Sequence, residues 1–249
     1  MRKLYFLLAG LLVFSGMQAQ IVTIPDANFK QLLLSNNPIA KNISGSYFKI
    51  DANSDGQIQV SEAQNVIELS FSDTGAAITS IVGITSFSNL TDLYCPANGI
   101  SSMDLRGLTS LKKLNCFSNS LTSLNLQGLV NLTDLICSQN QLTSINLNGL
   151  ANLTSIDCSD NKLTSLDLDG LVSLSYLDCS YNQLKTIDLS GIVIRYPVFD
   201  LNNNGLTSFT LKNGVLEQSV SFANNPNLQF VCVDESETIG IQNKIKQYG

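Results

Sequence analysis

The stretch Leu132-x-x-Leu135-x-Cys137-x-x-Asn140-x-Leu142-x-x-Ile145-x-Leu147-x-Gly149-Leu150 decides the fold, because the sequence repeats it almost five times between Leu90 and Leu189. Its leucine, cysteine and asparagine positions recur at a constant step of 21 residues. The positions are Leu90, Leu111, Leu132, Leu153 and Leu174; Cys95, Cys116, Cys137, Cys158 and Cys179; and Asn98, Asn119, Asn140, Asn161 and Asn182.

Each copy has the pattern of a short strand followed by a turn. Leu135 and Cys137 alternate at period two, so both point inward while Ile136 points outward. Asn140 turns the chain, and its side-chain amide can hydrogen-bond backbone groups that strand pairing leaves free. A single copy, here called a coil, cannot bury its apolar face alone, so stacked coils are expected to share one core and one parallel sheet.

This pattern resembles the leucine-rich repeat family, and specifically the short-repeat, internalin-like class of secreted bacterial proteins. The resemblance implies an α/β-type repeat solenoid with a parallel sheet on its concave face and helical caps at both ends. An irregular first coil begins at Val66, and two more coils follow the regular five, at Phe199 and Val220. We therefore expect about eight stacked coils over residues 66–233.

The ends of the chain differ from the repeats. Residues 1–19 predict a secretory signal peptide, because Arg2 and Lys3 precede an apolar run shorter than the roughly 20 residues of a spanning helix. Residues 20–65 predict a helical N-terminal cap, and residues 234–249 predict a C-terminal capping helix. Proteins resembling this one often continue into a sorting domain, so a truncated cap and a longer exported protein stay open.

The composition excludes several functions. The chain carries 14 basic and 20 acidic residues, a formal charge of -6, and no histidine. An acidic chain argues against nucleic acid or an anionic membrane as partner, since both attract clustered lysine and arginine. Without histidine, the commonest acid-base group and metal ligand is missing. We expect a monomer that does not insert into membranes and is not an enzyme.

One loop in the N-terminal cap fits the calcium loop of EF-hand-like proteins, Asp-x-[Asp/Asn]-x-[Asp/Asn]-Gly-x5-Glu, at every specified position. Oxygen ligands at loop positions 1, 3, 5, 7 and 12 converge on one hard cation in such loops. We therefore expect one bound calcium ion; the alternative is a turn that leads into a helix and binds nothing. The expected ligands are Asp51, Asn53, Asp55, the carbonyl of Gln57, and Glu62.

The expected partner-binding surface is the outward side of the parallel sheet. Exposed aromatic and branched side chains with acids beside them are typical of binding surfaces. The alternative is an ordinary solvated face, since scattered exposed apolar residues are common. The candidate contact residues are Tyr94, Phe117, Ile136, Asp157, Tyr176, Asp178, Tyr181 and Asp200.

These features predict a non-catalytic binding module, secreted or on the outer cell surface, that engages an extracellular protein or glycan. The alternative is a passive structural spacer of a larger exported protein. Stacked carboxylates such as Asp157, Asp178 and Asp200 can in principle perform glycoside chemistry. A rigid open ladder offers no cleft that would raise one pKa and exclude water, so we do not expect an enzyme.

The five cysteines of the repeats are expected to be buried free thiols. In-register parallel strands hold equivalent side chains about 4.8 Å apart, whereas a disulfide requires Cβ atoms about 3.8 Å apart. Cys232 lies outside this ladder, and a cysteine beyond Gly249 could pair with it.

Overall fold

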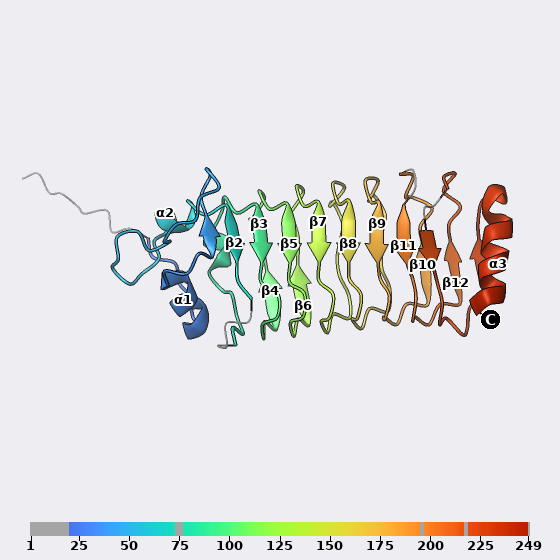
Figure 1. The fold of residues 1–249 in the computed structure, drawn as a ribbon, viewed down its shortest axis with the longest axis horizontal. Coiled ribbons are helices and arrows are strands. Elements are labelled where there is room, and N and C mark those ends of the chain that lie inside the picture. Colours follow the sequence, from blue (N-terminus) through green and yellow to red (C-terminus); the bar gives the residue numbers. More distant parts are fainter. Residues whose placement is uncertain (1–19, 73–76, 195–196, 217–218, 249) are drawn as a thin grey trace, which may run out of the picture.

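The chain forms a row of stacked coils between a helix-bearing N-terminal cap and a C-terminal helix, as Figure 1 shows. The computed structural model describes residues 20–72, 77–194, 197–216 and 219–248. The predicted signal peptide, residues 1–19, lies outside the described residues. No helix within the described ranges has the length and apolarity needed to cross a membrane.

The main sheet confirms the predicted parallel stack. Across the described residues it has nine strands in the order β1-β2-β3-β5-β7-β8-β9-β11-β13, with β1 antiparallel to β2 and every other pair parallel. The eight parallel strands are linked by about seven turns of the solenoid. The strands are β1 Ala40–Lys41, β2 Glu68–Ser70, β3 Asp92–Tyr94, β5 Lys113–Asn115, β7 Asp134–Ile136, β8 Ser155–Asp157, β9 Tyr176–Asp178, β11 Val198–Asp200 and β13 Ser219–Ser221.

Shorter sheets form where the coils return. β4 pairs with β6, and β10, β12 and β14 pair in that order, all in parallel. Within the described part of the chain, helices occur only in the caps and in one 3-10 turn of the irregular first coil. These strands are β4 Ser102–Asp104, β6 Ser123–Asn125, β10 Thr186–Asp188, β12 Ser208–Thr210 and β14 Phe230–Cys232. The helices are α1 Ala27–Leu34, α2 Val60–Ala63, η1 Ile84–Ser86, η2 Glu235–Glu237 and α3 Thr238–Tyr248.

One core runs the length of the stack. Leu135, Cys137 and Leu142 are fully buried, and their equivalents in the other regular coils are buried as well. The coil closes at Gly149, whose φ of 82° lies in the left-handed region that glycine enters without steric cost. Each coil therefore covers the apolar edge of its neighbour, which explains why the repeat spacing stays constant.

The repeated asparagine closes each turn after the strand. Asn161 Nδ2 donates to the carbonyl oxygens of Cys137 at 3.0 Å, Cys158 at 3.2 Å and Ser159 at 3.1 Å. Its Oδ1 accepts from the backbone N–H of Leu142 at 3.0 Å. One buried amide thus satisfies backbone groups of two neighbouring coils. The same four contacts are made by Asn140, Asn182, Asn204 and Asn225.

We predict that Asn161→Ala lowers the free energy of unfolding by about 3 kcal/mol, because it leaves several buried backbone groups without partners. Urea unfolding followed by circular dichroism measures this change. Asn152→Ala is the matched control, since exposed Asn152 donates only to Val130 O, at 2.8 Å. Equal losses in the two variants would contradict a special role for the buried ladder.

The N-terminal cap is attached through the residue that precedes its first helix. Asp26 caps α1, with Oδ1 accepting from Phe29 N at 2.9 Å. Its Oδ2 accepts from Thr79 N at 2.9 Å and from Ser80 N at 3.0 Å, both in the first coil. Burial acts to raise the pKa of Asp26, yet these hydrogen bonds from Phe29, Thr79 and Ser80 outweigh burial and lower it. One carboxylate therefore both starts the helix and fixes the cap to the solenoid.

The C-terminal helix covers the last coil, as predicted. Ile241 is buried against the core, and the Lys244 ammonium donates to the carbonyl of Val220 on β13. Ile245, four residues further along the helix, is 45% exposed. The two isoleucines share one helix face by their spacing, so only part of that face is buried.

The cysteine ladder is buried and unbridged, which confirms the sequence prediction. Cys95, Cys116, Cys137, Cys158 and Cys179 are free and buried, whereas Cys232 is free and exposed. Burial raises the pKa of the Cys95 thiol to about 12. Burial also raises the pKa of the other four ladder cysteines well above the usual thiol range. Such thiols stay protonated and act as small apolar fillers.

We predict that only Cys232 reacts with a thiol reagent in the folded chain, and that all six thiols react after denaturation without reductant. Counting the released chromophore before and after unfolding measures both values. Cys232→Ser is the control, because it should abolish the fast reaction and leave the denatured count lower by one. A denatured count of one or two would contradict the free ladder.

Candidate functional site

The outward side chains of the main sheet form aligned columns, here called the sheet face. Strand pairing places Asp157 beside Asp178 and Asp178 beside Asp200. The first column is Ser70, Tyr94, Asn115, Ile136, Asp157, Asp178, Asp200 and Ser221. The second is Glu68, Asp92, Lys113, Asp134, Ser155, Tyr176, Val198 and Ser219. The structure therefore confirms the register that was read from the repeat.

One group of acids on the sheet face surrounds Tyr94, near the N-terminal cap. The Tyr94 hydroxyl donates to Asp92 Oδ1 at 3.1 Å. Burial, together with the nearby charges of Asp92, Glu68 and Asp134, raises the pKa of Tyr94 to about 12. Lys41 neutralises Glu68 through an ion pair of 2.7 Å. This end of the face is therefore negative but partly balanced.

A second group of acids lies around Tyr176, toward the C-terminal end. Burial raises the pKa of Tyr176, and the charges of Asp178, Asp157 and Asp200 raise it further. Burial also raises the pKa of Asp200, with an added contribution from Asp178. In the described ranges, none of these three aspartates forms an ion pair. The negative charge at this end is therefore not balanced by a neighbouring cation.

These three aspartates line a hollow of about 530 Å³, here called the acid hollow. Tyr181 and Phe117 stand at it with 61% and 36% of their surfaces exposed. The other lining residues are polar or acidic turn residues next to the strands. They are Ser138, Gln139, Ser159, Asp160 and Ser180.

The turn after each strand brings these side chains to the hollow. Gln139, Asp160 and Tyr181 occupy the same position in successive coils and have φ values of 53°, 50° and 52°. A left-handed conformation is uncommon outside glycine and is held here by the surrounding coil. The asparagine ladder directly after this position stabilises the turn. Tyr181 is thus presented to solvent by a rigid backbone.

Serine hydroxyls orient the aspartates within the hollow. Asp157 accepts from Ser159 Oγ at 2.7 Å and from Ser138 Oγ at 2.8 Å. Asp178 Oδ1 accepts from Ser180 Oγ at 2.6 Å and from Ser180 N at 2.9 Å. The hollow therefore presents fixed carboxylates whose neighbouring hydroxyls are already used as donors.

The acid hollow collects five of the eight predicted contact residues, namely Phe117, Asp157, Asp178, Tyr181 and Asp200. Tyr94, Ile136 and Tyr176 lie on the sheet face outside its lining. The sequence reasoning did not select the serine row Ser138, Ser159 and Ser180. A readable signal existed, because the residue after each cysteine changes from Pro96 and Phe117 to serine in these three coils.

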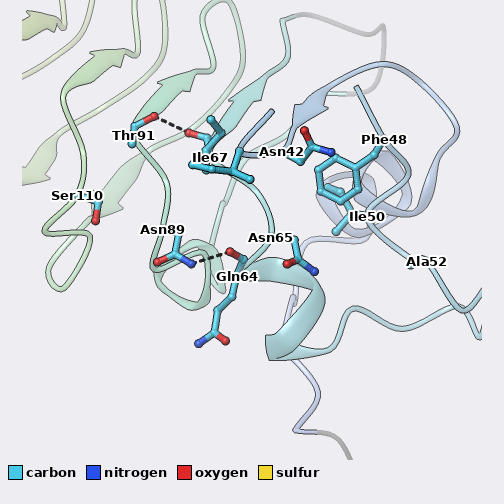
Figure 2. Close-up of a pocket in the computed structure, with 11 residues that line it drawn as sticks. Asn42, Phe48, Ile50, Ala52, Gln64, Asn65, Ile67, Asn89, Thr91 and Ser110 are labelled. Carbon is cyan, nitrogen blue, oxygen red and sulfur yellow. Dashed lines mark hydrogen bonds between the residues drawn. The ribbon is translucent and has the colours of Figure 1, made fainter. Parts of the chain in front are cut away.

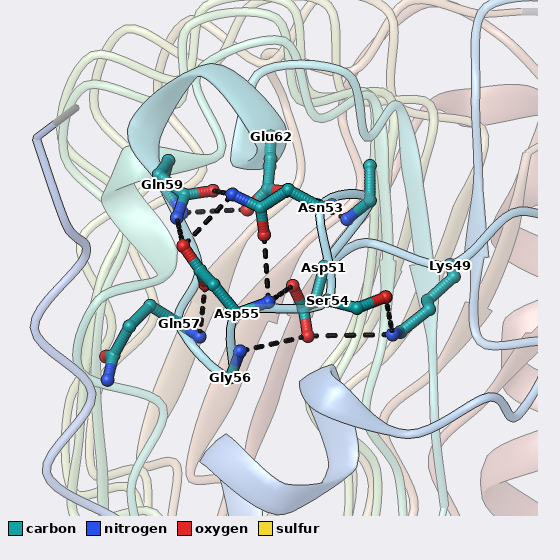
Figure 3. Close-up of polar contacts among 10 residues, drawn as sticks. Lys49, Asp51, Asn53, Ser54, Asp55, Gly56, Gln57, Gln59 and Glu62 are labelled. Atoms are coloured by element: carbon teal, nitrogen blue, oxygen red, sulfur yellow. Dashed lines mark hydrogen bonds and ion pairs between the residues drawn. The ribbon is translucent and has the colours of Figure 1, made fainter.

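The predicted calcium loop folds into a tight turn ahead of α2 (Figure 3). Gly56 has a φ of 76°, as a sharp turn at loop position 6 requires. Asp51 and Glu62 are buried, with 4% and 8% of their surfaces exposed. Asp51 accepts from the backbone of Asp55 at 3.1 Å and of Gly56 at 3.3 Å. The loop backbone is thus held by its own acids.

The oxygen chemistry of the loop suits calcium, which prefers oxygen ligands, but these oxygens contact donors of the loop itself. Asn53 Nδ2 and Gln59 Nε2 donate to Asp55 Oδ2 at 3.0 and 2.7 Å. Glu62 accepts from Ala52 N at 2.8 Å and from Gln59 N at 3.0 Å. Among the described residues, no three His, Cys, Asp or Glu side chains lie close enough together to hold a metal ion. A cation would have to displace the amide contacts of Asp55.

A larger hollow, of about 700 Å³, lies between the N-terminal cap and the first coils (Figure 2). Phe48, Ile50 and Ile67 supply apolar surface, and none of the described residues that line it is charged. Across its floor, Asn89 Nδ2 donates to Gln64 O at 2.8 Å. The repeat pattern alone did not predict this hollow, because it forms where the irregular cap meets the first coils.

The stacked coils, inward leucines and asparagine ladder define a leucine-rich repeat solenoid. A family model described as "Leucine Rich repeats (2 copies)" matches residues 151–191. Such domains are typically protein-binding modules and are usually not catalytic. No curated protein matches the chain significantly.

Solved structures share this fold at low sequence identity. An internalin of Listeria monocytogenes matches with a TM-score of 0.58 and 17% identity, over 92% of this chain and 77% of its own. Internalin C2 of the same organism has a TM-score of 0.46 and 22% identity, over 88% and 98%. A leucine-rich repeat protein of Leptospira interrogans has a TM-score of 0.49 and 20% identity over 77% of this chain, which spans 62% of that protein.

Proposed function

We propose that this chain is a non-catalytic binding module, exported to the outside of the cell, that engages an extracellular protein or glycan through its sheet face. The carrying observation is the alignment of exposed aromatic and acidic side chains in register along a rigid parallel sheet. Side chains held this way lose little conformational entropy on binding, so their contacts contribute more fully to affinity. The repeat core lies behind this face and leaves it free for a partner.

The face also argues against catalysis. Asp157 and Asp178 accept hydrogen bonds from neighbouring serines, so both carboxylates are held in place by the turn and lie on an open face. The pKa of Asp200 is raised by burial, but its hollow is open to solvent, and no histidine exists anywhere in the chain to relay a proton. Binding can use the same carboxylates without a closed site and without a group that relays protons.

We predict that Tyr94→Ala and Tyr176→Ala each weaken partner binding by more than about 1 kcal/mol, as loss of aromatic anchors does. Protein and glycan arrays probed with the chain from Gln20 would identify the partner, and titration calorimetry would measure the loss. Val130→Ala and Val172→Ala are matched controls, because both valines are about half exposed in connecting turns. Stability should scarcely change, since neither tyrosine is part of the core.

An unchanged affinity in the double tyrosine variant would place the contact elsewhere. If no protein or glycan binds, the chain is better described as a passive spacer in a larger exported protein.

We further propose that the loop from Asp51 to Glu62 takes up one calcium ion, which fixes the N-terminal cap. The observation that favours this role is the burial of Asp51 and Glu62, because buried carboxylates are costly unless a positive charge balances them. Lys49 forms an ion pair with Asp51 at 3.6 Å, and no described lysine or arginine pairs with Glu62. The proposed ligands are Asp51, Asn53, Asp55, Gln57 and Glu62. Calcium binding would exchange the amide contacts of Asp55 for the cation.

We predict that calcium raises the thermal midpoint of the chain, whereas magnesium does not. With three carboxylates the affinity should be weak, about 10⁻⁴ to 10⁻³ M, as in other extracellular modules. At free calcium about 100 times the dissociation constant, the gain is about 2.7 kcal/mol. Differential scanning calorimetry in chelator and in about 10 mM calcium measures it.

Glu62→Gln should remove most of this calcium-dependent increment, because loop position 12 normally supplies two oxygens. Glu235→Gln is the control, since exposed Glu235 lies in the C-terminal cap. Comparing increments, and not absolute midpoints, separates calcium binding from the hydrogen bonds that Glu62 makes in the loop. An absent or magnesium-equal rise would reduce the loop to a structural turn.

A further inference from the structure

We infer that the acid hollow docks an extended, arginine- or lysine-bearing segment of a protein partner, with one cationic side chain between Asp178 and Asp200 and against the Tyr181 ring. This inference rests on the proposed binding function and names the partner chemistry of its main site. It follows from the hydrogen bonds of the hollow, its charge and its aromatic edge.

Each of the two central aspartates has one oxygen fixed and one oxygen available. Ser180 occupies Asp178 Oδ1 through its hydroxyl and its backbone N–H. The backbone N–H of Asn202 occupies Asp200 Oδ1 at 2.9 Å. Within the described residues, neither Oδ2 atom accepts a hydrogen bond. Asp178 and Asp200 are paired across β9 and β11, whose backbones lie about 4.8 Å apart, so the two carboxylates are neighbours on one side of the sheet.

The charge of the hollow is complementary to a cation. Asp157, Asp160, Asp178 and Asp200 line it, and none of the lysines or arginines in the described ranges does. The ion pairs of the described residues lie elsewhere, at Glu68, Asp51 and Asp104. The mutual repulsion that helps to raise the pKa of Asp200 is a cost that a bound cation would remove.

The hydrogen-bonding groups that line the acid hollow favour a basic side chain over a sugar as the ligand. The hydroxyls of Ser138, Ser159 and Ser180 already donate to Asp157 and Asp178, so the hollow offers mainly acceptors. A sugar hydroxyl both donates and accepts, whereas guanidinium and ammonium groups only donate. A guanidinium can also contact two carboxylate oxygens at once. The lining groups therefore favour a cationic side chain.

The aromatic edge fits the same occupant. Tyr181 is 61% exposed and held at a fixed backbone position next to the acids. A cation over the face of an exposed tyrosine ring is attracted by the ring's electron density. In an extended segment, side chains on one side recur about every 6.7 Å, so cations at alternate positions can reach the row from Asp157 to Asp200. The Tyr181 ring and the row of aspartates thus both favour an extended segment with basic side chains at alternate positions.

The test uses the chain from Gln20 and a synthetic serine-glycine peptide with arginine at alternate positions. Its twin carries citrulline, which keeps the shape and removes the charge. We expect the arginine peptide to bind, the citrulline peptide not to bind, and the affinity to fall as salt rises. Asp178→Asn with Asp200→Asn should weaken binding at least about tenfold while the fold is retained, because an asparagine Oδ1 can still accept the local hydrogen bonds.

The matched control is Asp167→Asn with Asp169→Asn, which removes the same charge from exposed acids in a connecting turn. Equal binding to the two double variants, or equal binding of the two peptides, would overturn the inference. A glycan that binds in a manner dependent on Asp178 and Asp200, with no peptide binding, would also overturn it yet keep the proposed function. The proposed function itself fails only if no array partner depends on Tyr94 and Tyr176.

Discussion

The side-chain amide of the repeated asparagine is the interaction on which this structure depends. A coil must turn after three paired residues, and its turn leaves backbone carbonyls and an N–H without strand partners inside an apolar core. Asn161 satisfies three such carbonyls and one N–H from the coil before it. The same amide contacts backbone groups of its own coil and of the coil before it. The hydrogen bonds that close a turn therefore also hold that coil to its neighbour. The asparagine therefore recurs once in each regular coil.

The ladder weakens where the repeat begins. Asn98 Nδ2 donates to Cys95 O and Pro96 O, but its buried Oδ1 has no partner among the described residues. The coil before it is irregular, so the amide cannot reach the usual N–H. Asp26 supplies a separate attachment there, from the cap to Thr79 and Ser80. The first coil is therefore held by the cap as well as by its neighbour.

The sequence predicted the structure of the regular repeats well, because the same spacing of buried residues recurs in every coil. The strand register, buried cysteines, α1 and α3 follow from period two, period 21 and helical spacing. The acid hollow was only partly predictable. Its aspartates, Phe117 and Tyr181 were among the predicted contact residues, but its serines were not, because their part in the hollow depends on how each turn orients its side chains. Ile245 shows the same limit, since helical spacing alone does not show how much of a helix face is buried.

The rigidity of the ladder links this fold to binding. Asp157, Asp178 and Asp200 each accept hydrogen bonds from a serine or a backbone N–H, and the turns beside them are held by the buried asparagines. A partner therefore meets acceptors that are already in place, and binding costs little side-chain entropy. The same rigidity prevents the face from closing around a substrate and excluding water. A negative, open and immobile surface gains most from a partner that brings both positive charge and its own adaptability, and an extended basic segment brings both.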